Sequence, residues 1–292
     1  MEIKAYAKLN FFLDVVGIRS DGYHDIISIM QTVDWYDVIK ISKNVSHETV
    51  LATNSVELSC GRENIAYRAV QKYLTATSMT DGLKIEIQKN IPIAAGMAGG
   101  SADAAAVLLG LNEMFDKRLS EEELLKLGAE LGADIPFCMK GGTGLVSGIG
   151  DKILPCGDFP DCTILCAKSG EGVSTPTAYR LLDEKNNFFH KITCHRKNLN
   201  IILDGIKNQN PFDASKGFFN VFEDTISALN PDVSKLKRIM TENGSYLCQM
   251  SGSGPSVFGL FHNEVEAEKA LHQVLQTGAE AKICHPVSKI QK

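Results

Sequence analysis

The segment at residues 92–102, Pro-Ile-Ala-Ala-Gly-Met-Ala-Gly-Gly-Ser-Ala, constrains the fold of this chain more than any other. Leu83, Ile85 and Ile87 alternate with polar residues just before it, which is the period of a half-buried strand. From Ser101 onward the residues favour a helix, with Ser101 expected as the cap and Asp103 in the first turn. The sequence therefore predicts a strand, a glycine-rich loop and a helix in direct succession.

Small residues in such a loop let an anion approach the backbone, and the N–H groups and dipole at the helix start attract it. The loop lacks the Gly-Lys-Ser/Thr ending of a Walker A motif, and its glycines do not have the GxGxxG spacing of a dinucleotide-binding turn. Taken alone, the segment is consistent with either a phosphate-binding loop or a closely packed turn.

Two other stretches near the N-terminus have clear periodicity. Apolar residues alternate along residues 3–15 and resume after a turn cluster at 17–22, so the first 40 residues predict a hairpin. Residues 120–123, Ser-Glu-Glu-Glu, form a capping box that starts a helix, and Gly132 stops it just before Asp134.

Strand and helix patterns continue to alternate in the second half, which indicates an α+β class for the chain as a whole. At 292 residues the chain is long enough for two domains with a core each. We place the boundary in the segment around residues 156–160, which gives an N-terminal domain at 1–157 and a C-terminal domain at 158–292.

Composition excludes several classes of partner. Lys and Arg number 30 against 35 Asp and Glu, a net charge of −5 without a basic stripe, which argues against nucleic acid. No apolar run approaches the roughly 18 residues of a membrane span and no leader pattern begins the chain, so we expect a cytoplasmic protein without a membrane partner. The eight cysteines lack a CxxC pair and are expected to be reduced, buried thiols. Oligomeric state cannot be read from this sequence.

Five further motifs occur along the chain in this order: Ala7-Lys8-Leu9-Asn10, Asp21-Gly22-Tyr23-His24, Glu63-Asn64, Gly132-Ala133-Asp134-Ile135-Pro136-Phe137 and Ser251-Gly252-Ser253-Gly254-Pro255. Together with the loop they make nearly the whole chain resemble the GHMP family of small-molecule kinases. The resemblance implies a two-domain GHMP kinase fold with the active site in the interdomain cleft. It also implies transfer of the γ-phosphoryl group of ATP, with Mg²⁺, to an alcohol. The motif order is similar to that of a member whose small-molecule substrate is a polyol linked to cytidine diphosphate.

The same resemblance implies roles for particular residues. Lys8 and Asp134 would be the catalytic pair, with Asp134 accepting or orienting the proton of the substrate hydroxyl and Lys8 offsetting negative charge. An alternating strand presents Lys8 and Asn10 on one face. The substrate would be held by Asn10, Tyr23, His24, Thr175 and Tyr179, with aromatic rings stacked on the base. ATP would be held by Asn64, Pro92, Ile93, Ala94, Ala95, Gly96, Met97, Ala98, Gly99, Gly100, Ser101 and Ala102.

One departure from the family pattern concerns the metal. Many relatives carry two serines after the glycines, whereas Ser101 is followed here by Ala102, so the Mg²⁺ ligands stay unassigned. Two alternatives remain: a GHMP kinase for another alcohol, such as mevalonate or homoserine, and a relative that binds without phosphorylating. Tyr23 and His24 argue against the first, and the presence of both Lys8 and Asp134 argues against the second.

Overall fold

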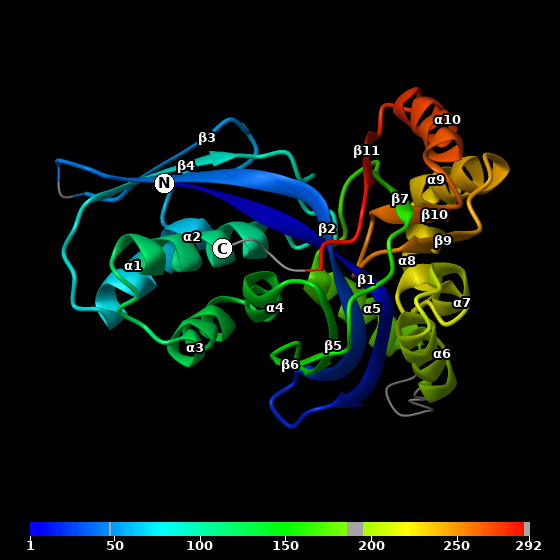
Figure 1. Ribbon diagram of the computed structural model, residues 1–292, viewed down its shortest axis with the longest axis horizontal. Helices are drawn as coiled ribbons and strands as arrows, with labels where there is room; N and C mark the ends of the chain where they lie inside the picture. Colours follow the sequence, from blue (N-terminus) through cyan, green and yellow to red (C-terminus); the bar gives the residue numbers. More distant parts are fainter. Residues whose placement is uncertain (47, 186–194, 289–292) are drawn as a thin grey trace.

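The computed structural model describes residues 1–46, 48–185 and 195–288 (Figure 1). Strands and helices alternate along both halves, so the mixed architecture expected from the sequence is confirmed. The strands are β1 Glu2–Ile18, β2 His24–Lys43, β3 Val50–Thr53, β4 Leu83–Gln88, β5 Thr143–Gly148, β6 Lys152–Pro155, β7 Thr163–Lys168, β8 Phe219–Asn220, β9 Leu247–Met250, β10 Val257–Phe261 and β11 Glu280–Cys284. The helices are α1 Ile65–Ala76, α2 Gly99–Met114, α3 Glu121–Leu131, α4 Ile135–Lys140, α5 Thr175–Lys185, α6 Arg196–Lys207, α7 Pro211–Ser215, α8 Glu223–Leu229, α9 Pro231–Glu242 and α10 Glu264–Leu275.

The predicted hairpin is confirmed as β1 and β2, which pair antiparallel from Glu2↔Lys40 to Ile18↔His24. Strand β2 is long enough to pair with β5 along its first half and with β4 along its second half. The sheet order is β3-β4-β2-β1-β8, with β5 and β6 attached beside β2. Three register shifts interrupt the β1–β2 pairing, and residues 8–10 lie between two of them.

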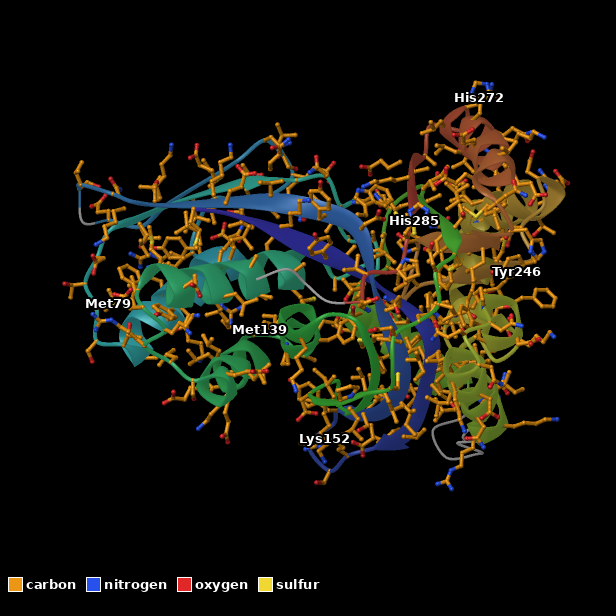
Figure 2. All side chains as sticks on the ribbon, in the orientation of Figure 1. Met79, Met139, Lys152, Tyr246, His272 and His285 are labelled. Carbon is orange, nitrogen blue, oxygen red and sulfur yellow. The ribbon has the colours of Figure 1, made fainter. Side chains whose placement is uncertain are left out.

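Helices α1 to α4 gather on one side of this sheet (Figure 1). They enclose an apolar core with the strands, and the buried Met139 of α4, labelled in Figure 2, belongs to it. Helix α3 begins with the predicted capping box, since Ser120 accepts from the Glu123 N–H while the Glu123 carboxylate accepts from the Ser120 N–H. That prediction is therefore confirmed.

The second sheet is antiparallel, with the order β11-β7-β10-β9. Helices α9 and α10 pack beside it, as the right side of Figure 1 shows, and they bury Leu236, Met240, Ala267 and Val274 in a second core. Tyr246, labelled in Figure 2, precedes β9 and its ring contacts Phe212 and His262.

The two halves of the chain share a β-sheet and a buried apolar cluster. Strand β8 comes from the second half but pairs in parallel with β1, through Phe12↔Phe219 and Leu13↔Asn220. A third buried cluster joins Phe11 of β1 to Phe218 and to Phe258 of β10. The expected boundary between residues 157 and 158 falls between β6 and β7, and the division into domains at that point stays a prediction.

Two expectations about composition meet the structure here. The described cysteines are free thiols, and Cys138, Cys166 and Cys284 are buried as expected. The prediction is wrong at Cys60, which is exposed in the loop before α1, and Cys156, Cys162 and Cys248 are only partly buried. Cys194 lies outside the described residues. Among the residues that the structure describes, no helix combines the length and the apolar character needed to cross a membrane.

Candidate active site

The glycine-rich segment forms a loop between β4 and α2 with an unusual backbone. Ala94, Gly96 and Ala98 have positive φ angles of 53°, 73° and 58°. The first helical hydrogen bond runs from the Ala102 N–H to the Ala98 carbonyl, 2.8 Å, so the N–H groups of residues 99–101 precede the intrahelical ladder. These donors stand at the positive end of a helix and suit the oxygens of a phosphate.

The prediction that Ser101 caps this helix is wrong. Helix α2 begins at Gly99, because the left-handed Ala98 ends the loop there, and its cap makes no side-chain hydrogen bond. Ser101 is therefore the third helical residue, and it lines the cavity described below. Asp103 is buried against Lys89 instead of serving the first turn.

A turn from the second half of the chain packs directly on this loop. A Cβ atom at Gly96 would lie 2.4 Å from the carbonyl oxygen of Ser251, and one at Gly252 would lie 2.8 Å from the carbonyl oxygen of Gly96. The Ser251 hydroxyl donates to the Gly96 carbonyl at 3.2 Å, and the Ser256 N–H donates to the Ala95 carbonyl at 3.2 Å. Gly96 and Gly252 therefore allow the backbone of the loop and the backbone of the turn to lie in close contact.

A cavity of about 540 Å³ lies between the halves, over the glycine-rich loop at residues 92–102. The first half contributes side chains of β1, β2 and the loop, and the second half contributes the start of α5, Phe222 and the turn at 252–254. Of the residues expected from the sequence, Lys8, Asn10, Pro92, Ile93, Ala94, Ala95, Gly96, Ala98, Gly99, Gly100, Ser101, Asp134, Thr175 and Tyr179 line it. The cleft expected between the halves is therefore present.

Lys8 and Asp134 meet in this cavity. The Lys8 ammonium lies 3.7 Å from the Asp134 carboxylate, with the lysine side chain only 6% exposed and the aspartate side chain 32% exposed. Asp134 precedes α4 without capping it, so its carboxylate is not engaged by that helix. The Lys8 ammonium also donates to the Asn10 side-chain oxygen at 2.6 Å. The buried Lys8 ammonium and the partly exposed Asp134 carboxylate therefore lie together beside the glycine-rich loop.

His24 and Tyr179 form an aromatic pair between the first turn and α5. Their ring centres are 4.6 Å apart. The Tyr179 ring also contacts the Phe222 ring, with ring centres 4.8 Å apart. His24 Nε2 lies 2.9 Å from a carboxylate oxygen of Asp183. Burial raises the pKa of the Tyr179 hydroxyl, which therefore stays protonated.

Other predicted residues lie at the edge of the cavity or outside it. Tyr23 is 63% exposed at the turn, and neither Tyr23 nor His24 lines the cavity. Asn64 caps α1, with its oxygen accepting from the Ala66 N–H at 2.9 Å and its amide nitrogen donating to the Ser59 carbonyl at 2.7 Å. Met97 and Ala102 are buried beneath the loop.

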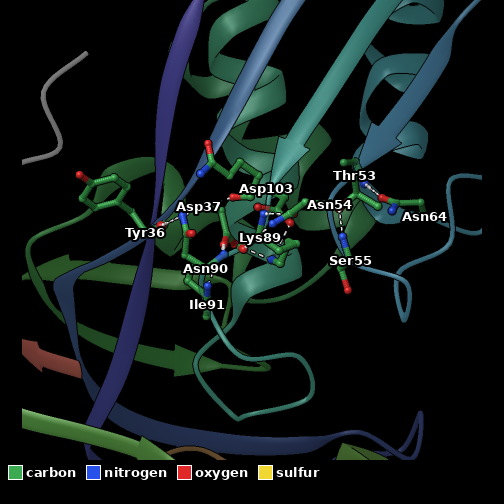
Figure 3. Close-up of polar contacts among 12 residues, drawn as sticks. Tyr36, Asp37, Thr53, Asn54, Ser55, Asn64, Lys89, Asn90, Ile91 and Asp103 are labelled. Carbon is green, nitrogen blue, oxygen red and sulfur yellow. Dashed lines mark hydrogen bonds and ion pairs between the residues drawn. The ribbon is translucent and has the colours of Figure 1, made fainter. Parts of the chain in front are cut away.

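Figure 3 shows a buried charge cluster at the base of the loop, where Lys89 joins Asp37 of β2 to Asp103 of α2. The Lys89 ammonium is 2.5 Å from Asp37 and 2.9 Å from Asp103. The other Asp37 oxygen accepts from the backbone N–H groups of Asn90 and Ile91, at 2.5 and 2.8 Å. The cluster therefore fixes the chain where it enters the loop.

The charge balance of that cluster perturbs its acids and bases. Burial and the nearby Asp37 carboxylate raise the pKa of Asp103 to about 8, against the opposing effect of the Lys89 ammonium. One Asp103 oxygen is buried and has no hydrogen-bond partner in the described residues. Burial lowers the pKa of Lys89, but the two carboxylates outweigh it and the net shift is upward.

Several residues of this region escaped the sequence reasoning. Asp183 and Phe222 have no local pattern that marks them, because each reaches the site through contacts with segments distant along the chain. Lys89 differs, since it stands three residues before the loop. A lysine so close to a phosphate-binding loop was a usable indication.

Comparisons with known proteins agree with this geometry. The model described as "GHMP kinases N terminal domain" matches residues 64–142, and the model described as "GHMP kinases C terminal" matches residues 196–280. A 4-diphosphocytidyl-2-C-methyl-D-erythritol kinase of Caldicellulosiruptor bescii is 42% identical over 274 residues, which cover 94% of this chain and 94% of that relative.

Solved structures give the same result. A crystal structure of 4-(cytidine 5'-diphospho)-2C-methyl-D-erythritol kinase superimposes with a TM-score of 0.80 at 29% identity, covering 98% of this chain and 99% of that one. A homoserine kinase from Cytophaga hutchinsonii shares the fold, with a TM-score of 0.73 at 20% identity. That match covers 99% of this chain and 96% of the homoserine kinase. The chain belongs to the GHMP kinases, and within them to the family of 4-diphosphocytidyl-2-C-methyl-D-erythritol kinases.

Proposed function

We propose that this chain transfers the γ-phosphoryl group of ATP to the 2-hydroxyl of 4-diphosphocytidyl-2-C-methyl-D-erythritol, in the non-mevalonate pathway to isoprenoid precursors. The observation that carries the proposal is the meeting of Lys8 and Asp134, 3.7 Å apart, in a cavity floored by the phosphate loop. The similarity to relatives with this activity supports the choice of substrate.

Phosphoryl transfer depends mainly on positioning and on electrostatic stabilisation. The N–H groups of residues 99–101 would hold phosphate oxygens of ATP, since they stand outside the helical ladder. Asp134 would accept or orient the proton of the attacking hydroxyl. Lys8 would position Asp134 and offset the negative charge that gathers between donor and acceptor.

The side chains present are compatible with Mg²⁺ held largely by ATP. Mg²⁺ prefers oxygen donors and takes only one or two carboxylates from a protein when phosphates supply other ligands. Among the described residues that line the cavity, Asp134 is the one carboxylate, and Ser101 adds a hydroxyl beside the loop. These two residues would hold the metal together with the phosphates of ATP. Bound there, Mg²⁺ would neutralise phosphate charge.

The His24–Tyr179 pair would hold the base. Nε2 of His24 faces the Asp183 carboxylate and donates to it, and in the neutral tautomer that donates there Nδ1 is an acceptor. An acceptor suits the exocyclic amine of cytosine and repels the oxygen that uracil carries at the same position. Tyr23, exposed at the neighbouring turn, is available to cover the base from the solvent side. Asn10 and Thr175, which line the cavity, would contact the rest of the substrate.

Asn64 is a weaker part of this proposal. Its neighbours Leu58 and Ile65 line the cavity, so the start of α1 is in reach of the nucleoside of ATP. The Asn64 side chain itself is engaged in capping, and we expect it to shape that wall without contacting the nucleotide. The cytoplasmic location expected from the sequence stays a prediction.

The first experiment is an ADP-release assay with Mg-ATP and 4-diphosphocytidyl-2-C-methyl-D-erythritol. Mevalonate, homoserine and the uridine analogue of the substrate are assayed in parallel. Turnover with the cytidine substrate alone supports both the reaction and the base pocket. Turnover with only mevalonate or homoserine would keep the kinase chemistry and refute the substrate, and equal turnover with the uridine analogue would refute the role of His24.

A further inference from the structure

A chain of side-chain hydrogen bonds runs from Lys8 into the sheet behind it. The Lys8 ammonium donates to the Asn10 side-chain oxygen at 2.6 Å, and the Asn10 amide nitrogen donates to the Ser28 hydroxyl at 2.8 Å. The Ser28 hydroxyl in turn donates to the backbone carbonyl of Phe12 at 2.5 Å. Ser28 is fully buried and does not line the cavity, so it has no direct contact with a ligand there.

The groups at the two ends of this hydrogen-bond series, the Phe12 carbonyl and the Lys8 ammonium, determine which atom donates in each hydrogen bond. A backbone carbonyl only accepts, so the single hydrogen of the Ser28 hydroxyl points to Phe12. Ser28 therefore meets Asn10 as an acceptor, and the amide must turn its nitrogen toward Ser28 and its oxygen toward Lys8. The ammonium, which only donates, requires the same orientation. The Phe12 carbonyl and the Lys8 ammonium therefore both require the same orientation of the Asn10 amide.

We propose that Ser28 is a positioning residue for phosphoryl transfer. By holding the amide nitrogen of Asn10, it keeps the amide oxygen against the Lys8 ammonium and so keeps Lys8 beside Asp134. The inference rests on the proposed function, because it matters only if Lys8 and Asp134 form the catalytic pair.

Removal of the Ser28 hydroxyl would release this restraint without moving the strand. The Asn10 backbone N–H is held separately, by the Ser251 hydroxyl at 3.2 Å, and the β1–β2 ladder pairs Asn10 with Met30. In S28A the buried amide nitrogen has no acceptor, and the side chain is free to turn. A flipped amide would present N–H groups to the ammonium and push Lys8 away from its present place.

The predicted result separates positioning from binding. In S28A we expect kcat to fall at least tenfold, while the KM for ATP stays within twofold of wild type. ATP affinity, measured by equilibrium binding without turnover, should also stay within twofold. The conservative variant S28T keeps a hydroxyl and should return kcat to within threefold of wild type.

A matched control is S215A. Ser215 is also buried and also donates its hydroxyl to a backbone carbonyl, that of Phe212 at 2.8 Å, but it lies in α7 and does not line the cavity. Both alanine variants should show similar losses in urea unfolding, and S215A should keep wild-type kcat. A kcat loss in S28A no larger than that in S215A would overturn the proposal. So would a loss expressed mainly in KM.

The test also distinguishes this inference from the proposed function. If wild type phosphorylates a different alcohol, the substrate assignment fails in the wild-type assay, and the S28A comparison is then made with that alcohol. A tenfold kcat loss there still supports the positioning role. An unchanged kcat refutes it whichever alcohol is the substrate.

Discussion

Replacing Gly96 by alanine tests whether the shape of the phosphate loop depends on the turn that packs on it. Gly96 has φ +73°, and its new Cβ would lie 2.4 Å from the Ser251 carbonyl oxygen and 3.2 Å from the Gly254 nitrogen. Both neighbours are backbone atoms, so neither can swing aside. Ordinary contact begins at 3.4 Å, which means that the loop or the turn must move by about 1 Å.

The expected cost has two parts. The left-handed conformation itself costs an alanine about 1–2 kcal/mol in folding free energy. The displacement acts on function, because a misplacement of about 1 Å in a group that positions a reacting phosphate lowers the rate about a hundredfold. We therefore expect kcat/KM for ATP to fall about a hundredfold in G96A.

Gly278 provides the matched control. It has φ +84°, and a Cβ atom there would meet nothing within 4 Å. G278A should lose about the same 1–2 kcal/mol in urea unfolding while keeping the wild-type kcat/KM. Steady-state kinetics at varied ATP and unfolding curves of both variants make the comparison. If G96A retained the wild-type kcat/KM, or if both variants lost it equally, the argument from the loop contact would fail.

Four further substitutions test other residues in and around the site. D134A should lower kcat about 10²–10⁴-fold with ATP affinity roughly kept, and near-wild-type turnover would remove Asp134 from catalysis. Y179A and Y23A should each raise the KM for the cytidine substrate about 5- to 150-fold, the equivalent of one stacked ring, and a pure kcat loss would contradict stacking. Because burial raises the pKa of Asp103 to about 8, the folded protein keeps a proton that the unfolded chain releases, and stability falls as the pH rises from about 4 to 8. Relative to wild type, D103N should gain stability as the pH rises across that window, and urea titrations that give parallel pH curves would contradict this.

Local patterns predicted the elements that carry the site. The alternation along β1 placed Lys8 and Asn10 on one face, and the two side chains do meet. The prediction held although β1 has three register shifts, because residues 8–10 lie between them and the pleat is uninterrupted there. Asp134, expected after the helix stopped by Gly132, also lines the cavity, and its carboxylate lies 3.7 Å from the Lys8 ammonium.

Long-range contacts account for what the sequence did not predict. The start of α2 was misplaced because Ala98 adopts a left-handed conformation that alanine rarely takes, and it does so within a loop pressed between β1 and the turn after β9. Asp183 was missed because its role comes from a contact with His24, 159 residues away. Neither feature has a local pattern, so neither could be read from spacing.

The phosphate loop is held by both halves of the chain, and this bears on where the domains divide. Three consecutive carbonyls are bound from outside the loop: Ala95 by the Ser256 N–H, Gly96 by the Ser251 hydroxyl and Met97 by the Lys8 N–H. Met97 and Ala95 also belong to the buried cluster that β1 shares with β7 and β10. A cut between residues 157 and 158 would therefore expose an apolar core and free two of those three carbonyls. The first half carries the proposed catalytic pair, Lys8 and Asp134, but the conformation of the loop beside that pair depends on the second half.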